Sequence, residues 1–446
     1  VTTRQGEDSM ASLLRQHFHT AVTVLAALLA ISTVMAGSPS RVAGRDNLGV
    51  RVRAGPVDPP LERPNIILIV TDDQRWDTIG VDDGVMPLLA HGLRRESVVF
   101  TNAVVSSPLC CPVRSSILSG GFAVHHHGVW TNTLPNGSAP RFQDARSLST
   151  LLRDQGYFTV FVGKYMNNLG KVTGRSVDGT FIERAHYVPP GWDAFLGYVD
   201  DSPDWFDYRI DIGTSTNAGP MRGLLLPAEL GVSDAVLVAM SQVGFPQSVR
   251  ALIQQMPFSP APHVSEFERD LTLTLLDDME SHPDRPFFLY LGLAEPHGPA
   301  TPAPGDVGLF PDFFYDDRGW GEEDLSDKPA HIQRSGEGFS ALLAGEKSFR
   351  KNDPRLPEEF FGDQWRSLRG VDRTVDALLT RLRANPALAR RTVIMYSSDH
   401  GVQWGEHRLL GKKKLPYEES LRVPFLLRVP GVPPASRTVW WRRIST

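Results

Sequence analysis

Short apolar runs that alternate with segments of helical periodicity constrain most strongly what this chain can fold into. The run at 65–71, NIILIVT, is aliphatic almost throughout, which is typical of a strand buried on both faces of a sheet. Between such runs, apolar residues recur at steps of three and four, the spacing of a helix with one buried face. The alternation predicts an α/β fold with a large mixed, mostly parallel sheet between helices. The expected strands are 65–71, 98–105, 158–163, 286–293, 392–397 and 424–429, and the clearest expected helices are 147–153, 267–279 and 371–382.

The alternation extends over most of the 446 residues and implies one large domain with additions rather than several independent domains. We place this domain at 63–436, with insertions at about 200–262 and 300–365, where the strand and helix patterns are interrupted. Residues 437–446, RTVWWRRIST, fit neither pattern, and we interpret them as an atypical tail.

Residues 1–36 have the pattern of an extension followed by an export signal. Arg15 precedes an apolar run at 21–36, and small residues surround the expected cleavage point. A single membrane anchor is the alternative, but the run is shorter than the ~20 apolar residues that a membrane span needs. We therefore expect a secreted or periplasmic protein without a stable membrane anchor. Residues 37–62, which contain several Pro, Gly and Arg, are then a linker.

Polar side chains follow the expected strands at the points where the strands end. In open α/β sheets the carboxyl ends of parallel strands meet at one edge, where ligands bind. Neighbouring carboxylates repel one another unless a cation lies between them, and Ca²⁺ or Mg²⁺ prefers such oxygen ligands. A turn or a helix cap is the alternative for an Asp-Asp pair taken alone. The group expected at this edge, with a metal ion held by its acids, comprises Asp72, Asp73, Lys164, His297, Asp399 and His400.

The formal charge of −5 argues against nucleic acid as a partner, so an anionic ligand must be met by a local cluster of cations. The two cysteines, Cys110 and Cys111, are adjacent and cannot link distant segments by disulfides. Pro112 fits the first turn of a helix, which would place both thiols at a helix N-terminus, where backbone N–H groups favour anionic chemistry. A buried cysteine pair without a chemical role is the alternative.

With these features, the sequence resembles the type I sulfatases of the alkaline-phosphatase superfamily. The most specific match is CCPVRSSILSG at 110–120, a Cys-x-Pro-x-Arg pattern, together with NIILIVTDDQ at 65–74. VGKYMNN at 162–168, EPHGPATPAP at 295–304, and SSDHGVQWGEH with GKKKLPYEESLRVPF within 397–425 match in family order. The resemblance implies an alkaline-phosphatase-like sandwich. It also implies a small C-terminal antiparallel subdomain, which we expect to be truncated because the tail does not continue it.

In that family a formylglycine-generating enzyme oxidises the first cysteine of the segment, which makes Cys110 the modified residue and Arg114 the residue that holds it. The hydrated aldehyde is a gem-diol. One hydroxyl attacks the sulfur of a sulfate ester, and the second then expels sulfate and regenerates the aldehyde, so that catalysis is covalent and has two steps. The resemblance thus implies a sulfuric ester hydrolase whose partner is a glycan or small-molecule sulfate ester.

The remaining roles follow from the same resemblance. Acids at the strand ends correspond to metal ligands, with Ca²⁺ the usual ion and Mg²⁺ the alternative, although imidazole is a poor partner for a hard cation. Basic residues correspond to the groups that bind sulfate oxygens and protonate the leaving group. The implied metal ligands are Asp72, Asp73, Asp399 and His400; the implied catalytic cations are Lys164, His297 and Lys413; the implied substrate contacts are Lys412, His126 and Asn167.

The sequence also departs from the family pattern. Val113 stands where a small residue is usual, which can reduce conversion of Cys110, and Met166 stands where many members carry a histidine. The doubled cysteine and the Lys-Tyr-Met-Asn segment resemble glucosamine-6-sulfatases and favour a sulfated sugar over an aryl sulfate. The alternatives that remain open are a phosphodiester or phosphonate monoester hydrolase of the same superfamily, and an inactive truncated homologue.

Overall fold

The computed structural model describes residues between Arg63 and Arg437. Contacts divide the chain into two units, Val1–Arg63 and Pro64–Thr446. The predicted export signal, the linker and residues 438–446 lie outside the described residues. Within 63–437, the residues that are not described are 81–83, 123–127, 170–172, 176–180, 184–186, 200–204, 207, 209, 214–223, 227–246, 248–249, 252–261, 314, 316–318, 336–338, 344, 346–354 and 412.

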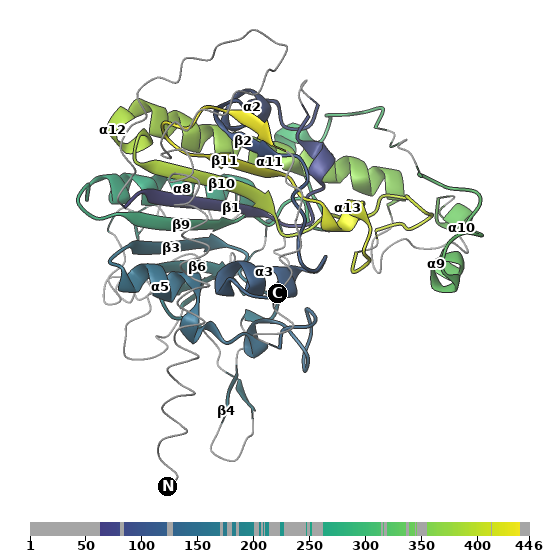
Figure 1. Ribbon diagram of the computed structural model, residues 1–446, viewed down its shortest axis with the longest axis horizontal. Coiled ribbons are helices and arrows are strands. Elements are labelled where there is room, and N and C mark those ends of the chain that lie inside the picture. Colours follow the sequence, from purple (N-terminus) through teal and green to yellow (C-terminus); the bar gives the residue numbers. More distant parts are fainter. Residues whose placement is uncertain are drawn as a thin grey trace, which may run out of the picture. The chain divides into compact units, whose positions relative to one another are not determined.

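A ten-stranded sheet forms the centre of the second unit (Figure 1). In sheet order its strands are β12 (Ala435–Arg437), β2 (Val98–Phe100), β11 (Phe425–Arg428), β10 (Thr392–Ser398), β1 (Asn65–Thr71), β9 (Phe287–Gly292), β3 (Phe158–Gly163), β6 (Ala194–Tyr198), β7 (Ile210–Gly213) and β8 (Leu224–Leu226). The middle strands, from β10 to β6, are all parallel, and antiparallel β11 and β7 flank them. The predicted mixed, mostly parallel sheet is therefore confirmed. A separate hairpin comprises β4 (Thr173–Arg175) and β5 (Phe181–Glu183).

Helices of very different length accompany the sheet. The α-helices are α2 (Pro87–His91), α3 (Cys110–Ser119), α5 (Leu148–Asp154), α8 (Val264–Glu280), α9 (Ala330–Ser335), α10 (Phe339–Leu343), α11 (Pro357–Ala384), α12 (Pro386–Ala389) and α13 (Glu418–Leu421). The short 3₁₀ helices are η1 (Trp76–Thr78), η2 (Leu93–Glu96), η3 (Ala139–Arg141), η4 (Asp144–Arg146) and η6 (Pro304–Asp306).

The two faces of the sheet carry separate apolar clusters, because successive side chains of a strand point to opposite faces. Ile67 and Ile69 of β1 belong to a cluster that also contains apolar residues of α8 and α11. Ile66, Leu68 and Val70 belong to a second cluster, to which α3 and α5 contribute. Burial of β1 on both faces explains its unbroken aliphatic sequence and fixes the edge at which its end residues emerge.

The strand and helix predictions hold for the core and differ at its margins. The strands expected at 65–71 and 158–163 have the predicted bounds. The strand expected at 98–105 ends at Phe100, because Thr101 and Asn102 form a turn. The helix expected at 371–382 is part of the longer α11, whose amphipathic pattern continues back to Pro357.

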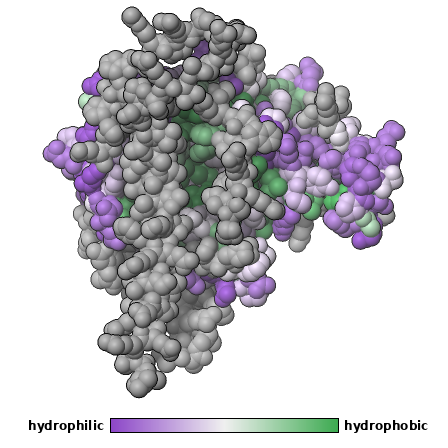
Figure 2. Space-filling model, in the orientation of Figure 1, coloured by the Kyte–Doolittle hydropathy of each residue, from purple (hydrophilic) through white to green (hydrophobic). Residues whose placement is uncertain are grey.

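The stretches that we interpreted as insertions also contain regular structure. β7 and β8 lie within 200–262 and extend the sheet at its edge. Within 300–365 are η6, α9, α10 and the first turns of α11. The region that includes α9, at the right of Figure 1, has a mainly hydrophilic surface in Figure 2. In the described part of the chain, no helix is both long and apolar enough to cross a bilayer.

Candidate active site

The carboxyl ends of the parallel strands bring the predicted acids together. Thr71 at the end of β1 pairs with Ser398 at the end of β10, so that the residues after each strand emerge side by side. The backbone N–H of Asp73 donates to Asp399 Oδ1 at 3.1 Å. Asp73 has a φ of 66°, a left-handed conformation that Asp tolerates better than most residues. The backbone at this edge therefore holds the acidic residues at 72–73 and 399 in contact.

The helix α3 presents Cys110 and Arg114 to this edge. Cys110 is the first residue of α3, as predicted, and Arg114 lies one turn later on the same face. Arg114 Nε donates to Asp399 Oδ2 at 2.9 Å, and its Nη1 donates to the backbone oxygen of Lys164 at 2.6 Å. Both side chains of the Arg114–Asp399 ion pair are fully buried. Arg114 thus fixes α3 against β10 and against the loop after β3.

Two lysines neutralise the acids that follow β1. Lys164 Nζ forms an ion pair with Asp72, and Lys413 Nζ contacts both carboxylate oxygens of Asp73, at 2.9 and 3.0 Å. Burial would raise the pKa of Asp72, but the surrounding positive groups, Lys164 foremost, together outweigh it and hold that pKa well below its ordinary value. Burial would likewise raise the pKa of Asp73, but Lys413 and the two neighbouring histidines together lower it. Both carboxylates are consequently ionised at neutral pH.

The pKa values of the two histidines of the site are shifted in opposite directions. Burial would lower the pKa of His400, but the carboxylate of Asp399 and then Cys110 outweigh it and raise that pKa to about 9. Burial and the charge of Lys164 lower the pKa of His297 to about 4. At neutral pH, His400 therefore carries a positive charge and His297 is neutral.

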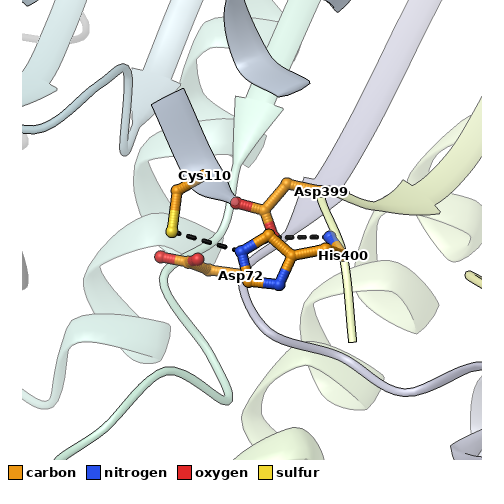
Figure 3. A group of neighbouring side chains, drawn as sticks. All are labelled: Asp72, Cys110, Asp399 and His400. Carbon is orange, nitrogen blue, oxygen red and sulfur yellow. Dashed lines mark hydrogen bonds and ion pairs between the residues drawn. The ribbon is translucent and has the colours of Figure 1, made fainter. Parts of the chain in front are cut away.

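Cys110 faces this charged group. Its Sγ lies 3.3 Å from His400 Nε2 (Figure 3) and 3.6 Å from Lys413 Nζ. His400 Nε2 also lies 3.3 Å from Asp73 Oδ1, and His297 Nε2 lies 3.8 Å from Asp73 Oδ2. The first residue of α3 is thus surrounded by the groups that the sequence placed at the strand ends.

Cys111 has different surroundings, although it is the next residue. Its Sγ lies 3.3 Å from both Oδ1 and the backbone nitrogen of Asn167, and its backbone N–H donates to Asn132 Oδ1 at 2.9 Å. Burial raises the pKa of the Cys111 thiol. The amide oxygen of Asn167, an expected substrate contact, is therefore directed to Cys111. Asn132 lies in a loop whose sequence gave no signal of this contact.

The chemistry of these donors fits a divalent cation. Potential ligand atoms of Asp72, Cys110, Asp399 and His400 lie within 4.8 Å of one another. Among the described residues, Asp72 Oδ1 is buried without a hydrogen-bond partner, which leaves a carboxylate oxygen available. Burial and then the charge of Asp72 raise the pKa of Asp399, so a bound cation would relieve this repulsion. Carboxylate oxygens suit Ca²⁺ or Mg²⁺, with His400 as the less suitable donor.

Two expected substrate contacts and the two departures from the family pattern remain to be placed. His126 and Lys412 lie outside the described residues. Val113 and Met166, which depart from the family pattern, are both buried. Met166 belongs to the apolar cluster that includes residues of β1, α3 and α5, so it packs in the core.

Comparisons with known proteins identify the family of this chain. The family model described as Sulfatase matches residues 64–445. The chain is 28% identical to an extracellular sulfatase of Drosophila melanogaster, over 83% of this chain and 28% of that protein. It is 27% identical to the N-acetylglucosamine-6-sulfatase of Homo sapiens, over 83% of this chain and 57% of that protein. It is 29% identical to an arylsulfatase of Volvox carteri, over 83% and 52%. The chain thus spans between 28% and 57% of the length of these relatives.

Solved structures share the fold at low sequence identity. One is the structure of a protein in complex with its substrate, D-glucosamine-2-N,6-O-disulfate. It matches with a TM-score of 0.56 and 18% identity, over 84% of this chain and 74% of that chain. Another is the phosphonate monoester hydrolase of Agrobacterium radiobacter, with a TM-score of 0.52, 18% identity and coverage of 84% and 70%. Both show that the alkaline-phosphatase-like architecture expected from the sequence is present.

Proposed function

The chain belongs to the sulfatase family, and we propose that it hydrolyses sulfate monoesters of sugars with Cys110, after oxidation to formylglycine, as the nucleophilic residue. The observation that carries this proposal is the position of Cys110 Sγ, 3.3 Å from His400 Nε2 and 3.6 Å from Lys413 Nζ at the edge where Asp72 and Asp399 emerge. This arrangement combines a nucleophile position with cations for an anionic substrate and acids for a metal ion.

Two groups complete the proposed site. Formylglycine at position 110 supplies a hydrated aldehyde, which offers a hydroxyl nucleophile and a second hydroxyl that a thiol lacks. A divalent cation, held by Asp72, Asp73 and Asp399 with His400 beside them, supplies positive charge that stabilises anionic oxygens. We propose Ca²⁺ as this ion, with Mg²⁺ as the alternative.

Lys164 and Lys413 are proposed to bind the sulfate oxygens. Each has a carboxylate partner, Asp72 for Lys164 and Asp73 for Lys413. When those carboxylates hold a cation, the lysines become available to an anion at the same edge. Charged hydrogen bonds in a buried site are about twice as strong as neutral ones, so they position the sulfate group and stabilise charge that develops in the transition state.

His297 is proposed to protonate the leaving oxygen. It is neutral in the free protein because burial and Lys164 lower its pKa to about 4. A bound sulfate anion raises the pKa of a neighbouring imidazole, which allows His297 to carry the proton that the departing alkoxide needs. Arg114 contacts Asp399 and the backbone of Lys164. Its proposed role is to fix the position of residue 110 relative to these two residues.

The proposed substrate is a sulfated sugar, because the relatives include an N-acetylglucosamine-6-sulfatase. An aryl sulfate is the second sulfate ester to test, because arylsulfatases are equally similar to this chain. We also propose that the protein is exported. The basis is the expected signal at 1–36 and the similarity to the sulfatase of Drosophila melanogaster that is described as extracellular.

The test is to produce the protein with a formylglycine-generating enzyme and to measure both conversion and turnover. Mass spectrometry of the Cys110 peptide should show a loss of about 18 Da, the change from thiol to aldehyde. Glucosamine 6-sulfate, an aryl sulfate, a phosphate diester and a phosphonate monoester are then compared by kcat/KM. We expect the highest value for the sulfated sugar. Dominant turnover of either phosphorus ester would overturn the sulfatase proposal, and an unmodified Cys110 peptide would support an inactive homologue.

A further inference from the structure

The sulfur of Cys110 lies among the candidate metal ligands rather than beside them. One group of ligand atoms that lie within 4.8 Å of one another comprises Asp72, Cys110, Asp399 and His400, all of them buried. Figure 3 shows the thiol and the carboxylates arranged around the imidazole of His400. In the unmodified chain this edge therefore offers a sulfur and a nitrogen in addition to oxygen ligands.

The spacing of these atoms suits a small tetrahedral ion. Zinc binds sulfur, nitrogen and oxygen ligands at about 2.0–2.3 Å, which separates ligand atoms by roughly 3.3–3.8 Å in a tetrahedron. Cys110 Sγ lies 3.3 Å from His400 Nε2, and that nitrogen lies 3.8 Å from Asp399 Oδ1. Only a modest contraction of the group is needed to place all four ligands around one ion.

Two further observations point to a ligand at this position. His400 Nδ1 lies 2.9 Å from the backbone oxygen of Gly401, so Nδ1 donates its proton there. This contact is typical of metal-binding histidines, because it leaves Nε2 directed to the ion. Asp72 Oδ1, buried without a hydrogen-bond partner among the described residues, supplies an oxygen that a cation would satisfy.

We propose that the unmodified, thiol form of this chain is a Zn²⁺ site formed by Cys110, His400, Asp72 and Asp399. Thiolate and imidazole ligands favour zinc over calcium, whereas carboxylates alone favour the harder ion. Metal binding requires the thiolate of Cys110 and the neutral imidazole of His400 as ligands. Oxidation of Cys110 removes the sulfur, so conversion to formylglycine changes the preference of the site from zinc to a hard cation. The inference concerns the same site as the proposed function but does not depend on sulfate hydrolysis.

The test uses Co²⁺ as a spectroscopic substitute for zinc. The full chain is produced without a formylglycine-generating enzyme, treated with a chelator, dialysed and titrated with Co²⁺. We expect a near-ultraviolet thiolate-to-Co²⁺ charge-transfer band that develops to one equivalent. Zn²⁺ should remove the band stoichiometrically, and a hundredfold excess of Ca²⁺ should leave it unchanged.

The neighbouring thiol provides the matched control. Cys110→Ser should abolish the band, whereas Cys111→Ser should retain it, because the sulfur of Cys111 contacts Asn167. His400→Gln should weaken Co²⁺ binding by at least roughly tenfold through loss of the nitrogen ligand. Circular dichroism of each variant establishes that it is folded.

Three results would overturn the inference: no band in the folded thiol form, a band that persists in Cys110→Ser, or displacement of Co²⁺ by Ca²⁺ as readily as by Zn²⁺. These outcomes are distinct from those for the proposed function. If the converted protein hydrolyses sulfate esters but the thiol form gives no band, only the zinc inference fails. If the band forms but the converted protein has no sulfatase activity, only the proposed function fails.

Discussion

Asp72 and Arg75 lie three positions apart after β1, yet they belong to two buried ionic clusters that differ in how fully their polar atoms are paired. In the Arg75 cluster, the guanidinium contacts Asp77, Glu406, the backbone oxygen of Val402 and the hydroxyl of Tyr315, at 2.5–3.0 Å. These contacts use all five N–H groups of an arginine. The rings of Tyr315 and Trp404 also lie 4.9 and 4.7 Å from its central carbon.

The candidate active site is incomplete by comparison. Among the described residues, Asp72 Oδ1 and Arg114 Nη2 are buried without hydrogen-bond partners. An unpaired buried polar atom destabilises a fold by about 1–3 kcal/mol, a cost that the metal ion proposed for this site would offset at Asp72. The Arg75 cluster instead joins the loop after β1 to the segment that leads to Lys413. The polar atoms of the Arg75 guanidinium are all paired within the protein, whereas the candidate active site retains two unpaired buried polar atoms among the described residues.

The largest expected effect separates the two adjacent cysteines. Cys110→Ala should lower kcat on the preferred sulfate ester by at least about 10⁴-fold, because it removes the nucleophile. Cys111→Ala should retain most of the activity, since its thiol contacts Asn167 and not the charged group. Steady-state kinetics measure both, with the unchanged protein and Cys111→Ala compared at full conversion. Equal losses in the two variants would show that Cys110 has been wrongly chosen.

The next effect concerns the complete cluster. Arg75→Met should lower the free energy of unfolding by about 3–5 kcal/mol, because it leaves the carboxylate of Glu406 buried without its cation. Urea denaturation in metal-free buffer measures the change. Tyr315→Phe, which removes one hydroxyl from the same cluster, is the matched control and should cost only about 1 kcal/mol. Unchanged stability in Arg75→Met would contradict a structural role for this cluster.

A smaller effect should come from the metal ion. At a Ca²⁺ concentration of about 100 times Kd, the free energy of unfolding of the converted protein should rise by about 2.7 kcal/mol. Asp72→Asn should abolish this increase, whereas Arg75→Met should retain it despite its lower stability. Denaturation with Ca²⁺ and with a chelator measures both. If Asp72→Asn responds to Ca²⁺ like the unchanged protein, Asp72 is not a ligand.

The smallest expected effect is a pH dependence from His297. Its folded-state pKa of about 4 lies below the ordinary value of 6.5, so the unfolded chain binds a proton first as the pH falls. His297 therefore leaves the free energy of unfolding unchanged above about pH 6.5 and lowers it progressively as the pH falls from 6.5 towards 4. The loss should be about 1–2 kcal/mol, because the side chain is 16% exposed and solvent screens part of the effect. His297→Asn in metal-free buffer should lose this part of the pH dependence; an unchanged profile would assign it elsewhere.

The sequence was sufficient to predict the core of the fold and the meeting of charged residues at one edge. Both follow from local patterns: aliphatic runs such as 65–71 identify buried strands, and the residues after a buried strand emerge at the sheet edge. The position of Cys110 at a helix N-terminus could be predicted for the same reason, because Pro112 restricts the first turn.

The contacts that complete the two clusters could not be predicted, because they join segments with no recognisable pattern. Tyr315 meets Arg75 across 240 positions from a stretch that we interpreted as an insertion, and Asn132 reaches the backbone of Cys111 from an irregular loop. The opposite charge states of His297 and His400 could not be predicted from the sequence either, since each depends on which charged side chains surround the imidazole in three dimensions.

The adjacent cysteines also provide an internal measure of maturation. The sequence contains two cysteines, and the proposed conversion to formylglycine would consume the thiol of Cys110 alone. In denaturant, every chain therefore releases either two reactive thiols or one, according to whether it has been converted. The mean thiol number of a preparation falls linearly from two to one with the converted fraction, and Cys111 supplies the constant reference within the same molecule.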